Sequence, residues 1–184
     1  MTVAAPANYA AGTWDIDPVH SDVSFSVRHM MVSKVRGRFT GVSGEIVTGA
    51  TLAESSVTAT IDASTIDTAN PDRDAHIRSK DFFEVETHPT WTFVSTSIEA
   101  DGDEFDLNGD LTIKGVTKPV TFKAEIGGFG PDAYGGTRNG FTATTTISRS
   151  DFGVDIAMPL EGGGVVVGDK ITITLEIEGV LRAV

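Results

Sequence analysis

The order of apolar and polar residues along this chain is dominated by a period of two. From residue 22 to residue 28, in the stretch DPVHSDVSFSVRHM (17–30), polar and apolar side chains alternate, which is typical of a β-strand with one buried face. The stretch KITITLEIEGVL (170–181) repeats this alternation near the end of the chain. The alternation predicts that the inward residues are Val23, Phe25, Val27, Ile173 and Leu175, and that the outward residues are Ser24, Ser26, Thr172 and Thr174.

About eight such segments follow one another after Trp14, separated by turns rich in Gly, Asp, Asn and Pro, as in sandwiches and barrels. Eight strands can close into a small barrel that holds one ligand, and the inward positions mix large and small side chains. The interior is therefore either an open channel or filled by side chains. The glycine-rich stretch GGFGPDAYGGTRNG (127–140) is predicted to be a flexible loop. The further residues predicted to line a pore are Phe93, Phe105, Leu107, Leu111, Phe122 and Phe141.

The segment NPDRDAHIRSKDFF (70–83) breaks the strand pattern and predicts a short helix over residues 71–82. Asn70 suits the N-cap, and Pro71 suits the first helical position. Asp74 lies four residues before Arg78, a spacing at which opposite charges attract along a helix. Because the apolar residues of this helix are Ile77 and the phenylalanines at its end, we expect it to lie against the barrel as a lid or plug.

Composition narrows the class of protein. The 184 residues are 40% hydrophobic and 22% charged and include no cysteine, as expected for one soluble domain without disulfides. We expect a flexible arm over residues 1–12 and a single domain over residues 13–184. The arm has no Lys or Arg and no long apolar run, so we predict no signal peptide and a cytoplasmic location. The sequence leaves the oligomeric state open, a homodimer included.

The charge balance limits the partners. The chain has 26 acidic and 14 basic residues, for a formal net charge of −12. This argues against a nucleic acid or an anionic membrane surface as partner, since both favour clustered Lys and Arg. No stretch approaches the ~20 apolar residues of a membrane-spanning helix, so no membrane span is predicted. A small ligand or a soluble partner remains.

Patterns typical of metal, nucleotide and hydrolase sites are missing. The four histidines include no HxH or HxxxH pair, so the sequence predicts no metal site. The glycine-rich stretches lack the Gly-Lys-Ser/Thr of a phosphate loop, and no GxSxG motif is present. The sequence therefore predicts no cofactor.

A group of charged residues falls in the predicted helix and after the seventh strand. Arg149 shares strand parity with Ile147 and is expected to point inward at a barrel end, where a carboxylate would neutralise it. We expect Arg73 or Asp74 to reach a charged partner near Arg149 or Asp151. The alternative role of these residues is a polar mouth that recognises a ligand headgroup. The residues assigned to this polar rim or structural network are His20, Arg73, Asp74, His76, Arg149 and Asp151.

His29 is the polar exception on the apolar face of its strand. We expect it near a barrel end, where a neutral imidazole can bond the protein with one nitrogen and a ligand headgroup or water with the other. The alternative is a buried histidine with both nitrogens bonded to protein.

Four long motifs resemble the YceI-like family, and they occur in the same order from Trp14 to Glu178. They are WDIDPVHSDVSFSVRHMMVSKVRGRFTGVSGEI (14–46), IDTANPDRDAHIRSKDFFEVETHPTWTFVS (66–95), GDLTIKGVTKPVTF (109–122) and ISRSDFGV (147–154). The resemblance implies an all-β, eight-stranded antiparallel lipocalin-like barrel with the short helix beside it. It also implies a long apolar pore for a polyisoprenoid or other long-chain lipid, a quinone or a prenyl diphosphate among them. The chain departs from the family at Ala69, where the family often has Gly. It is also expected to differ from the many exported relatives, because no signal peptide is predicted for it.

The leading hypothesis is therefore non-enzymatic binding, sequestration or transport of a long-chain amphiphile. One alternative is a lipocalin-like enzyme that uses His29 or His20 as general base on a small amphiphile. Another is a stress-related barrel whose ligand is incidental.

Overall fold

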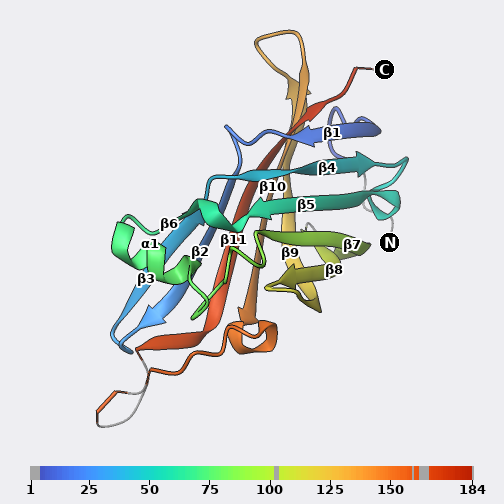
Figure 1. The fold of residues 1–184 in the computed structure, drawn as a ribbon. Coiled ribbons are helices and arrows are strands. Elements are labelled where there is room, and N and C mark those ends of the chain that lie inside the picture. The colour runs from blue at the N-terminus through green and yellow to red at the C-terminus, as the bar shows by residue number, and fades with distance from the viewer. Residues whose placement is uncertain (1–4, 102–103, 159, 162–165, 184) are drawn as a thin grey trace.

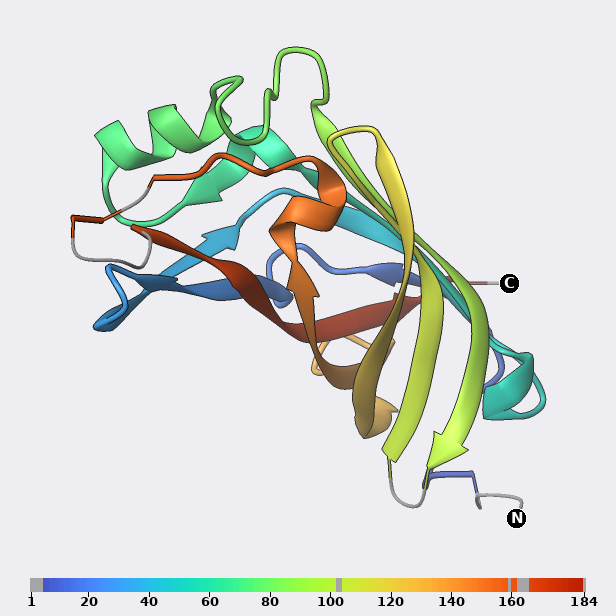
Figure 2. The same ribbon diagram turned by 90° about the horizontal axis from the view of Figure 1, so that it is seen from below.

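The chain forms a closed antiparallel β-barrel with one short helix (Figures 1 and 2). The structure, a computed structural model, describes residues 5–101, 104–158, 160–161 and 166–183. The strand segments are β1 (Gly12–Ile16), β2 (Asp22–His29), β3 (Ser33–Phe39), β4 (Val42–Thr48), β5 (Ser56–Asp62), β6 (Ile66–Asp67), β7 (Thr90–Asp101), β8 (Glu104–Ile113), β9 (Val116–Pro131), β10 (Thr137–Ser148) and β11 (Val167–Leu181). The helix is α1 (Pro71–Arg78), and the 3-10 turns are η1 (Leu52–Glu54), η2 (Ala63–Thr65) and η3 (Arg149–Phe152).

These segments make up eight strands, because three strands are interrupted. β1 and β2 both pair with β11, and β1 pairs with β4 while β2 pairs with β3. β4 pairs with β5 and β3 pairs with β6. Thus β1 with β2, β3 with β4, and β5 with β6 each act as one broken strand. Every strand pairs with its neighbour in the chain, and the contact between β1 and β11, with Trp14 opposite Leu181, closes the ring. The predicted eight-stranded barrel is confirmed.

The interruptions have local causes. Pro18, between β1 and β2, has no N–H for the ladder. Between β3 and β4 the chain turns at Gly41, whose N–H bonds the Thr65 Oγ1 at 2.9 Å while its carbonyl accepts from the Asp62 N–H at 2.8 Å. The break between β5 and β6 is η2, whose N-cap Asp62 accepts from the Ser64 N–H. These hydrogen bonds thus join the break between β3 and β4 to the neighbouring break between β5 and β6.

The predicted strand faces are confirmed in β11, and in β2 they hold for the inward residues. Val23 and Ile173 are buried, and Thr172 and Thr174 are exposed. Ser24 and Ser26, predicted to face water, are both half-buried. Ser24 borders the cavity, and its hydroxyl donates to the Thr174 carbonyl.

The predicted loop over residues 127–140 is largely strand. β9 continues to Pro131, β10 begins at Thr137, and Gly128 pairs with Gly140 across the ladder. Phe129 in this stretch is buried, with its ring centroid 5.5 Å from that of Trp14. The sequence prediction was wrong here because the buried aromatic ring holds an extended conformation that the glycines permit.

The helix begins as predicted but is shorter. The Asn70 side chain accepts from the Arg73 N–H at 3.0 Å, and Pro71 is the first helical residue. α1 ends at Arg78 rather than at residue 82. Ser79 is extended, and its hydroxyl donates to the His76 carbonyl at 2.6 Å, which competes with a further helical turn.

The later part of the predicted arm contacts the barrel. The Tyr9 hydroxyl donates to the Gly49 carbonyl at 2.9 Å, and its ring lies 5.0 Å from that of Phe129. Residues 1–4 lie outside the described residues, and the flexibility of residues 5–12 stays a prediction.

Candidate ligand cavity

A cavity of about 430 Å³ lies inside the barrel and is lined almost entirely by apolar atoms. The question left open by the sequence, channel or filled barrel, is therefore answered in favour of a channel. All twelve predicted pore residues border it: Val23, Phe25, Val27, His29, Phe93, Phe105, Leu107, Leu111, Phe122, Phe141, Ile173 and Leu175. Their role in binding a ligand stays a prediction.

The cavity reaches the surface at one end of the barrel. Two exposed residues border it there, Arg28 at the end of β2 and His76 in α1. Figure 2 shows that the β2–β3 turn (blue), α1 (green) and the start of β11 (red) lie at this end. We call it the open end.

Aromatic side chains that the sequence analysis left out form much of the wall. The Trp91 ring lies 4.7 Å from Phe39 and 4.8 Å from Phe83, centroid to centroid. Trp91 has the same strand parity as Phe93, so the alternation contained the signal for it. The Trp91 Nε1 is buried and has no hydrogen-bond partner in the described part of the chain. The wall therefore includes one buried donor without a partner among these residues, which is costly for a polar group.

A glycine opposite Phe25 provides room for its ring. A Cβ at Gly37 would lie 2.5 Å from the Phe25 Cζ, closer than any real contact. Since Gly37 faces Phe25 in the ladder, the ring lies against bare backbone. Larger residues at position 37 would push the ring away from the wall and into the cavity.

The segment predicted as a lid or plug lies at the open end. Ile77 of α1 and Phe82 and Phe83 after it border the cavity, as expected for a segment that lies against the barrel. The His76 ring stands edge-on to Phe82 with 5.1 Å between centroids, and its Nε2 lies 2.9 Å from the Asp81 Oδ2. The lid thus presents an apolar face inward and polar groups outward.

Arg149 borders the cavity as predicted, but its hydrogen-bond partners among the described residues are backbone carbonyls and not a carboxylate. Its guanidinium donates to the carbonyls of Val154 at 2.7 Å, Ile156 at 2.9 Å, Gly168 at 2.9 Å and Val167 at 3.3 Å. Asp151 is exposed, and it does not border the cavity. Arg149 therefore ties the segment after η3 to the start of β11.

The expected link from the helix to Arg149 is wrong as well. Arg73 donates from Nε to the Thr68 Oγ1 and from Nη2 to the Thr68 carbonyl, both at 2.8 Å. Asp74, buried in α1, accepts from the Thr68 N–H at 2.9 Å and from its hydroxyl. Because Thr68 lies just before the helix, both charged groups are satisfied locally. Arg73 still borders the cavity, whereas Asp74 does not.

His29 lies at the open end, half-buried and on the cavity wall. It faces Ser33 across the β2–β3 ladder, and Val167 of β11 on its other side. Its ring makes no hydrogen bond to another described residue. The alternative of a buried histidine with both nitrogens bonded to protein is therefore wrong, and the ring is free to meet a ligand headgroup or water.

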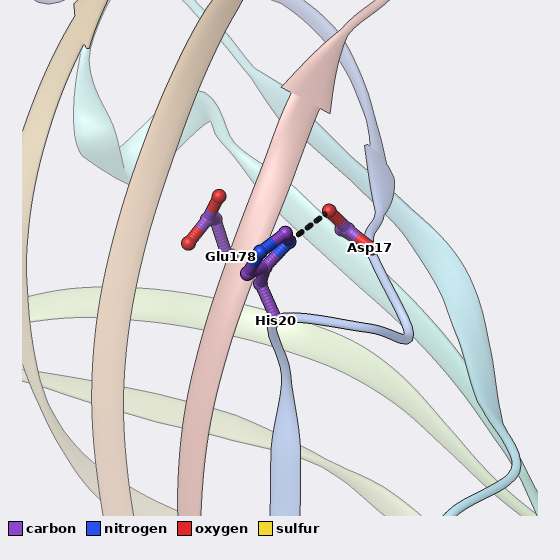
Figure 3. A group of neighbouring side chains, drawn as sticks. All are labelled: Asp17, His20 and Glu178. Carbon is purple, nitrogen blue, oxygen red and sulfur yellow. Dashed lines mark hydrogen bonds and ion pairs between the residues drawn. The ribbon is translucent and has the colours of Figure 1, made fainter. Parts of the chain in front are cut away.

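His20 belongs to a separate cluster and does not border the cavity. Its Nδ1 lies 2.8 Å from the Asp17 Oδ2, and Glu178 lies nearby (Figure 3). The Arg138 Nη1 donates to Asp17 at 2.7 Å and to Glu178 at 2.6 Å. Hydrogen bonds from His20 and Arg138 hold the pKa of Asp17 well below its usual range. A guanidinium thus already occupies the space between the carboxylates, so the cluster is an ion-pair network rather than a metal site.

Comparisons with known proteins agree with this geometry. The family model described as YceI-like domain matches residues 14–179. The chain belongs to the YceI-like family. A UPF0312 protein of Vibrio cholerae is 37% identical to this YceI-like chain over 158 residues, covering 85% of the chain and 84% of the relative. A UPF0312 protein of Pseudomonas aeruginosa is 35% identical over 167 residues, covering 90% and 84%.

Solved structures share the fold of this YceI-like chain. The crystal structure of Burkholderia cenocepacia BcnA superposes with a TM-score of 0.77 at 26% identity, covering 89% of this chain and 98% of that one. A polyisoprenoid binding domain from Saccharophagus degradans superposes with a TM-score of 0.68 at 15% identity, covering 94% and 100%. The second likeness concerns the fold alone. Among the described residues, no helix has the length and apolar character needed to cross a membrane.

Proposed function

We propose that this YceI-like protein binds, sequesters or transports a polyisoprenoid or similar long-chain amphiphile in its cavity, without catalysing a reaction on it. The observation that carries the proposal is the apolar cavity of about 430 Å³. Ligand pockets commonly measure ~300–1,000 Å³. The Saccharophagus degradans domain of the same fold is described as polyisoprenoid binding, which supports the assignment.

An apolar chain gains enough from such a wall to bind without charged contacts. Each buried methylene-sized group contributes about 0.8 kcal/mol, so ten of them give about 8 kcal/mol, equivalent to a Kd of about 1 μM. The entropy lost when the ligand and the side chains around it are immobilised reduces this favourable binding free energy. A ligand of several isoprene units is therefore the class that this cavity holds best.

The polar groups at the open end favour a weakly polar headgroup. Arg149 and Arg73 already donate to carbonyl and hydroxyl oxygens of the protein. His29, half-buried on the cavity wall, remains to meet a ligand. A single imidazole suits a quinone carbonyl or a prenyl hydroxyl better than a diphosphate, which needs paired cations.

Catalysis by a histidine base receives less support from this geometry. A general base needs a shielded site in which its proton transfer is controlled. The His20–Asp17 pair does not border the cavity, and the His76–Asp81 pair lies at the rim with each side chain about half exposed. His29, inside the rim, has no carboxylate partner among the described residues.

The proposal is tested by native mass spectrometry of protein purified without added lipid, followed by extraction and identification of the bound molecule. We expect an isoprenoid or other long-chain amphiphile at one copy per cavity. Ala143→Phe places a ring in the lumen and should abolish copurification. Thr142→Phe places the same ring on the outer face of β10 and should leave it unchanged. Equal lipid content in both variants, or protein that carries no lipid and binds no added prenyl alcohol, would refute the proposal.

The cytoplasmic location expected from the N-terminal sequence stays a prediction. Cell fractionation with antibody detection of the protein tests it.

A further inference from the structure

The turn between β2 and β3 exposes an unusual run of apolar side chains at the open end. Met30, Met31 and Val32 are 46%, 55% and 82% exposed. They make up half of the six exposed large hydrophobic residues in the described part of the chain, and they are consecutive. Exposed apolar residues gathered in this way mark interaction sites.

The backbone of this turn adopts a conformation that methionine disfavours. The Val32 N–H bonds the His29 carbonyl at 3.2 Å, and the two central residues, Met30 and Met31, have φ of 50° and 63°. A hairpin turn with two positive φ angles favours Asn-Gly. The sequence thus keeps two apolar side chains at the tip against the preference of the backbone.

A cluster of cations covers the outer face of the same hairpin. Arg28, Lys34, Arg36 and Arg38 are all exposed, and Arg28 faces Lys34 across the ladder. They are four of the 14 basic residues, and residues 23–44 contain no Asp or Glu. Asp67 of β6 lies 3.7 Å from Arg38. The net charge of −12 therefore conceals one face of opposite sign.

The hairpin tip is joined to the open end of the cavity. His29 borders the cavity and directly precedes the tip, and the Met30 N–H bonds the Val166 carbonyl at 2.7 Å. Val166 and Val167 also border the cavity. A partner surface that binds the hairpin tip would therefore also lie next to the open end of the cavity.

We propose that the β2–β3 hairpin docks the open end of the cavity on an anionic lipid bilayer. Met30, Met31 and Val32 enter the interface between headgroups and acyl chains, where apolar side chains are favoured. The cations of the hairpin meet anionic headgroups, and the acidic remainder of the protein, repelled by the same surface, turns away from it. Since charge interactions in water fade over about 10 Å at 0.1 M salt, the local cluster outweighs the distant acids.

This inference goes beyond the proposed function, because a hairpin can dock whether or not the cavity holds a ligand. It is tested by flotation of the full chain with vesicles of phosphatidylcholine, with and without phosphatidylglycerol. We expect binding to the phosphatidylglycerol vesicles alone, weakening as salt rises. The absence of binding to these vesicles at low salt would overturn the proposal, as would equal binding to both kinds of vesicle.

A charge variant has a matched control. Each cation near an anionic surface tightens binding by about fivefold, so Lys34→Gln/Arg36→Gln should weaken it by about 25-fold. Lys118→Gln/Lys123→Gln on β9 makes the same change in net charge and should bind like the unmodified protein. Equal losses in the two variants would mean that total charge, rather than this hairpin, decides binding, and would overturn the assignment.

The apolar tip is tested by a variant that suits the turn. Met30→Asn/Met31→Gly provides the residues that positive φ angles favour, so the protein should unfold at the same or a higher temperature. We expect it to lose most of its vesicle binding. Unchanged vesicle binding would overturn the role of the tip. A wild-type dimer that this variant converts to monomer, without vesicle binding by either protein, would assign the tip to self-association instead.

The two proposals fail separately. Ala143→Phe should still bind vesicles while losing the copurified ligand, because Ala143 lies on β10, which pairs with β9 and β11 and not with the hairpin. If vesicle binding disappears together with the ligand, then the bound ligand and not the hairpin makes the contact with the bilayer. The docking proposal is then refuted, while the cavity proposal stands.

Discussion

Replacing Arg149 with Met removes the hydrogen bonds that join the segment after η3 to the start of β11. The methionine keeps a long apolar stem but has no donor, so four backbone carbonyls lose the guanidinium. Three of these bonds are 2.7–2.9 Å long, and the fourth, to Val167, is 3.3 Å. Hydrogen bonds from Ser150 and, to a smaller extent, the Arg149 charge lower the pKa of Asp169. That carboxylate keeps its hydrogen bond from the Ser150 N–H, so most of the cost comes from the carbonyls.

The magnitude follows from the burial of the site. A hydrogen bond from a charged donor is worth about 1.5–3 kcal/mol when it is shielded from water. Arg149 is only half-buried, so water replaces part of each lost bond. Taking about 1 kcal/mol for each of the three short bonds gives a loss of about 3 kcal/mol in the free energy of unfolding. For a chain of this size that lowers the Tm by roughly 6–12 °C.

Urea unfolding followed by tryptophan fluorescence measures this loss, with calorimetry for the Tm. Arg149→Lys should recover only part of the stability, because an ammonium lacks the planar fork that reaches several carbonyls. Arg36→Met, on the outer face of β3, is the control and should change stability by less than ~0.5 kcal/mol. If Arg149→Met also changes the free energy of unfolding by less than ~0.5 kcal/mol, water fully replaces the hydrogen bonds of the guanidinium. Our reasoning about Arg149 is then wrong.

Three further predictions concern single side chains. Hydrogen bonds hold the pKa of Asp17 low, so the contribution of this carboxylate to the free energy of unfolding is present above about pH 4 and is lost as the pH falls. In Arg138→Gln, the free energy of unfolding measured in urea should therefore depend less on acidification than in the wild type. Ala69 has a φ of 60°, a left-handed conformation that strains a residue with a Cβ. Ala69→Gly should therefore raise the Tm and increase the free energy of unfolding by about 1 kcal/mol, and a lower Tm would contradict this reasoning. His29→Phe should fold, bind a pure hydrocarbon as before and bind a prenyl alcohol more weakly in fluorescence titrations; equal affinities would exclude a headgroup contact.

The alternation of apolar and polar residues was sufficient to predict most of the strands and their inward faces, but not the strand structure within residues 127–140, where glycines interrupt the pattern. A period of two survives because each strand has one face in the lumen and one in water. The break between β3 and β4 was not predictable, since it depends on partners distant in the chain. Gly41, for example, bonds Thr65, which only the closed wall brings near.

The site was predictable to the extent that it follows strand parity. All twelve pore positions lie on the cavity, but whether they leave space depends on how rings are oriented, as at Phe25 beside Gly37. The partners of Arg149 had no signal in the sequence, because every residue carries a backbone carbonyl. Carboxylates were the visible candidates, and the guanidinium bonded the main chain instead. The docking face was hidden for a related reason, since net charge averages over opposite surfaces.

The closure between β1 and β11 also decides the order in which the barrel can fold. Apart from the contacts of β1 and β2 with β11, every contact along the wall joins strands that are neighbours in the chain, so it can form as a local hairpin. Trp14 meets Leu181 only across nearly the whole chain, and β2 meets β11 over a similar distance. Bringing such distant segments together carries the largest loop-closure entropy, and contacts of this range slow folding. A circular permutant that links the outer ends of β1 and β11 and is cut in the β9–β10 turn would make this ladder a hairpin. In this permutant the last pairing to form would be the one between β9 and β10, because these strands would then lie at opposite ends of the chain.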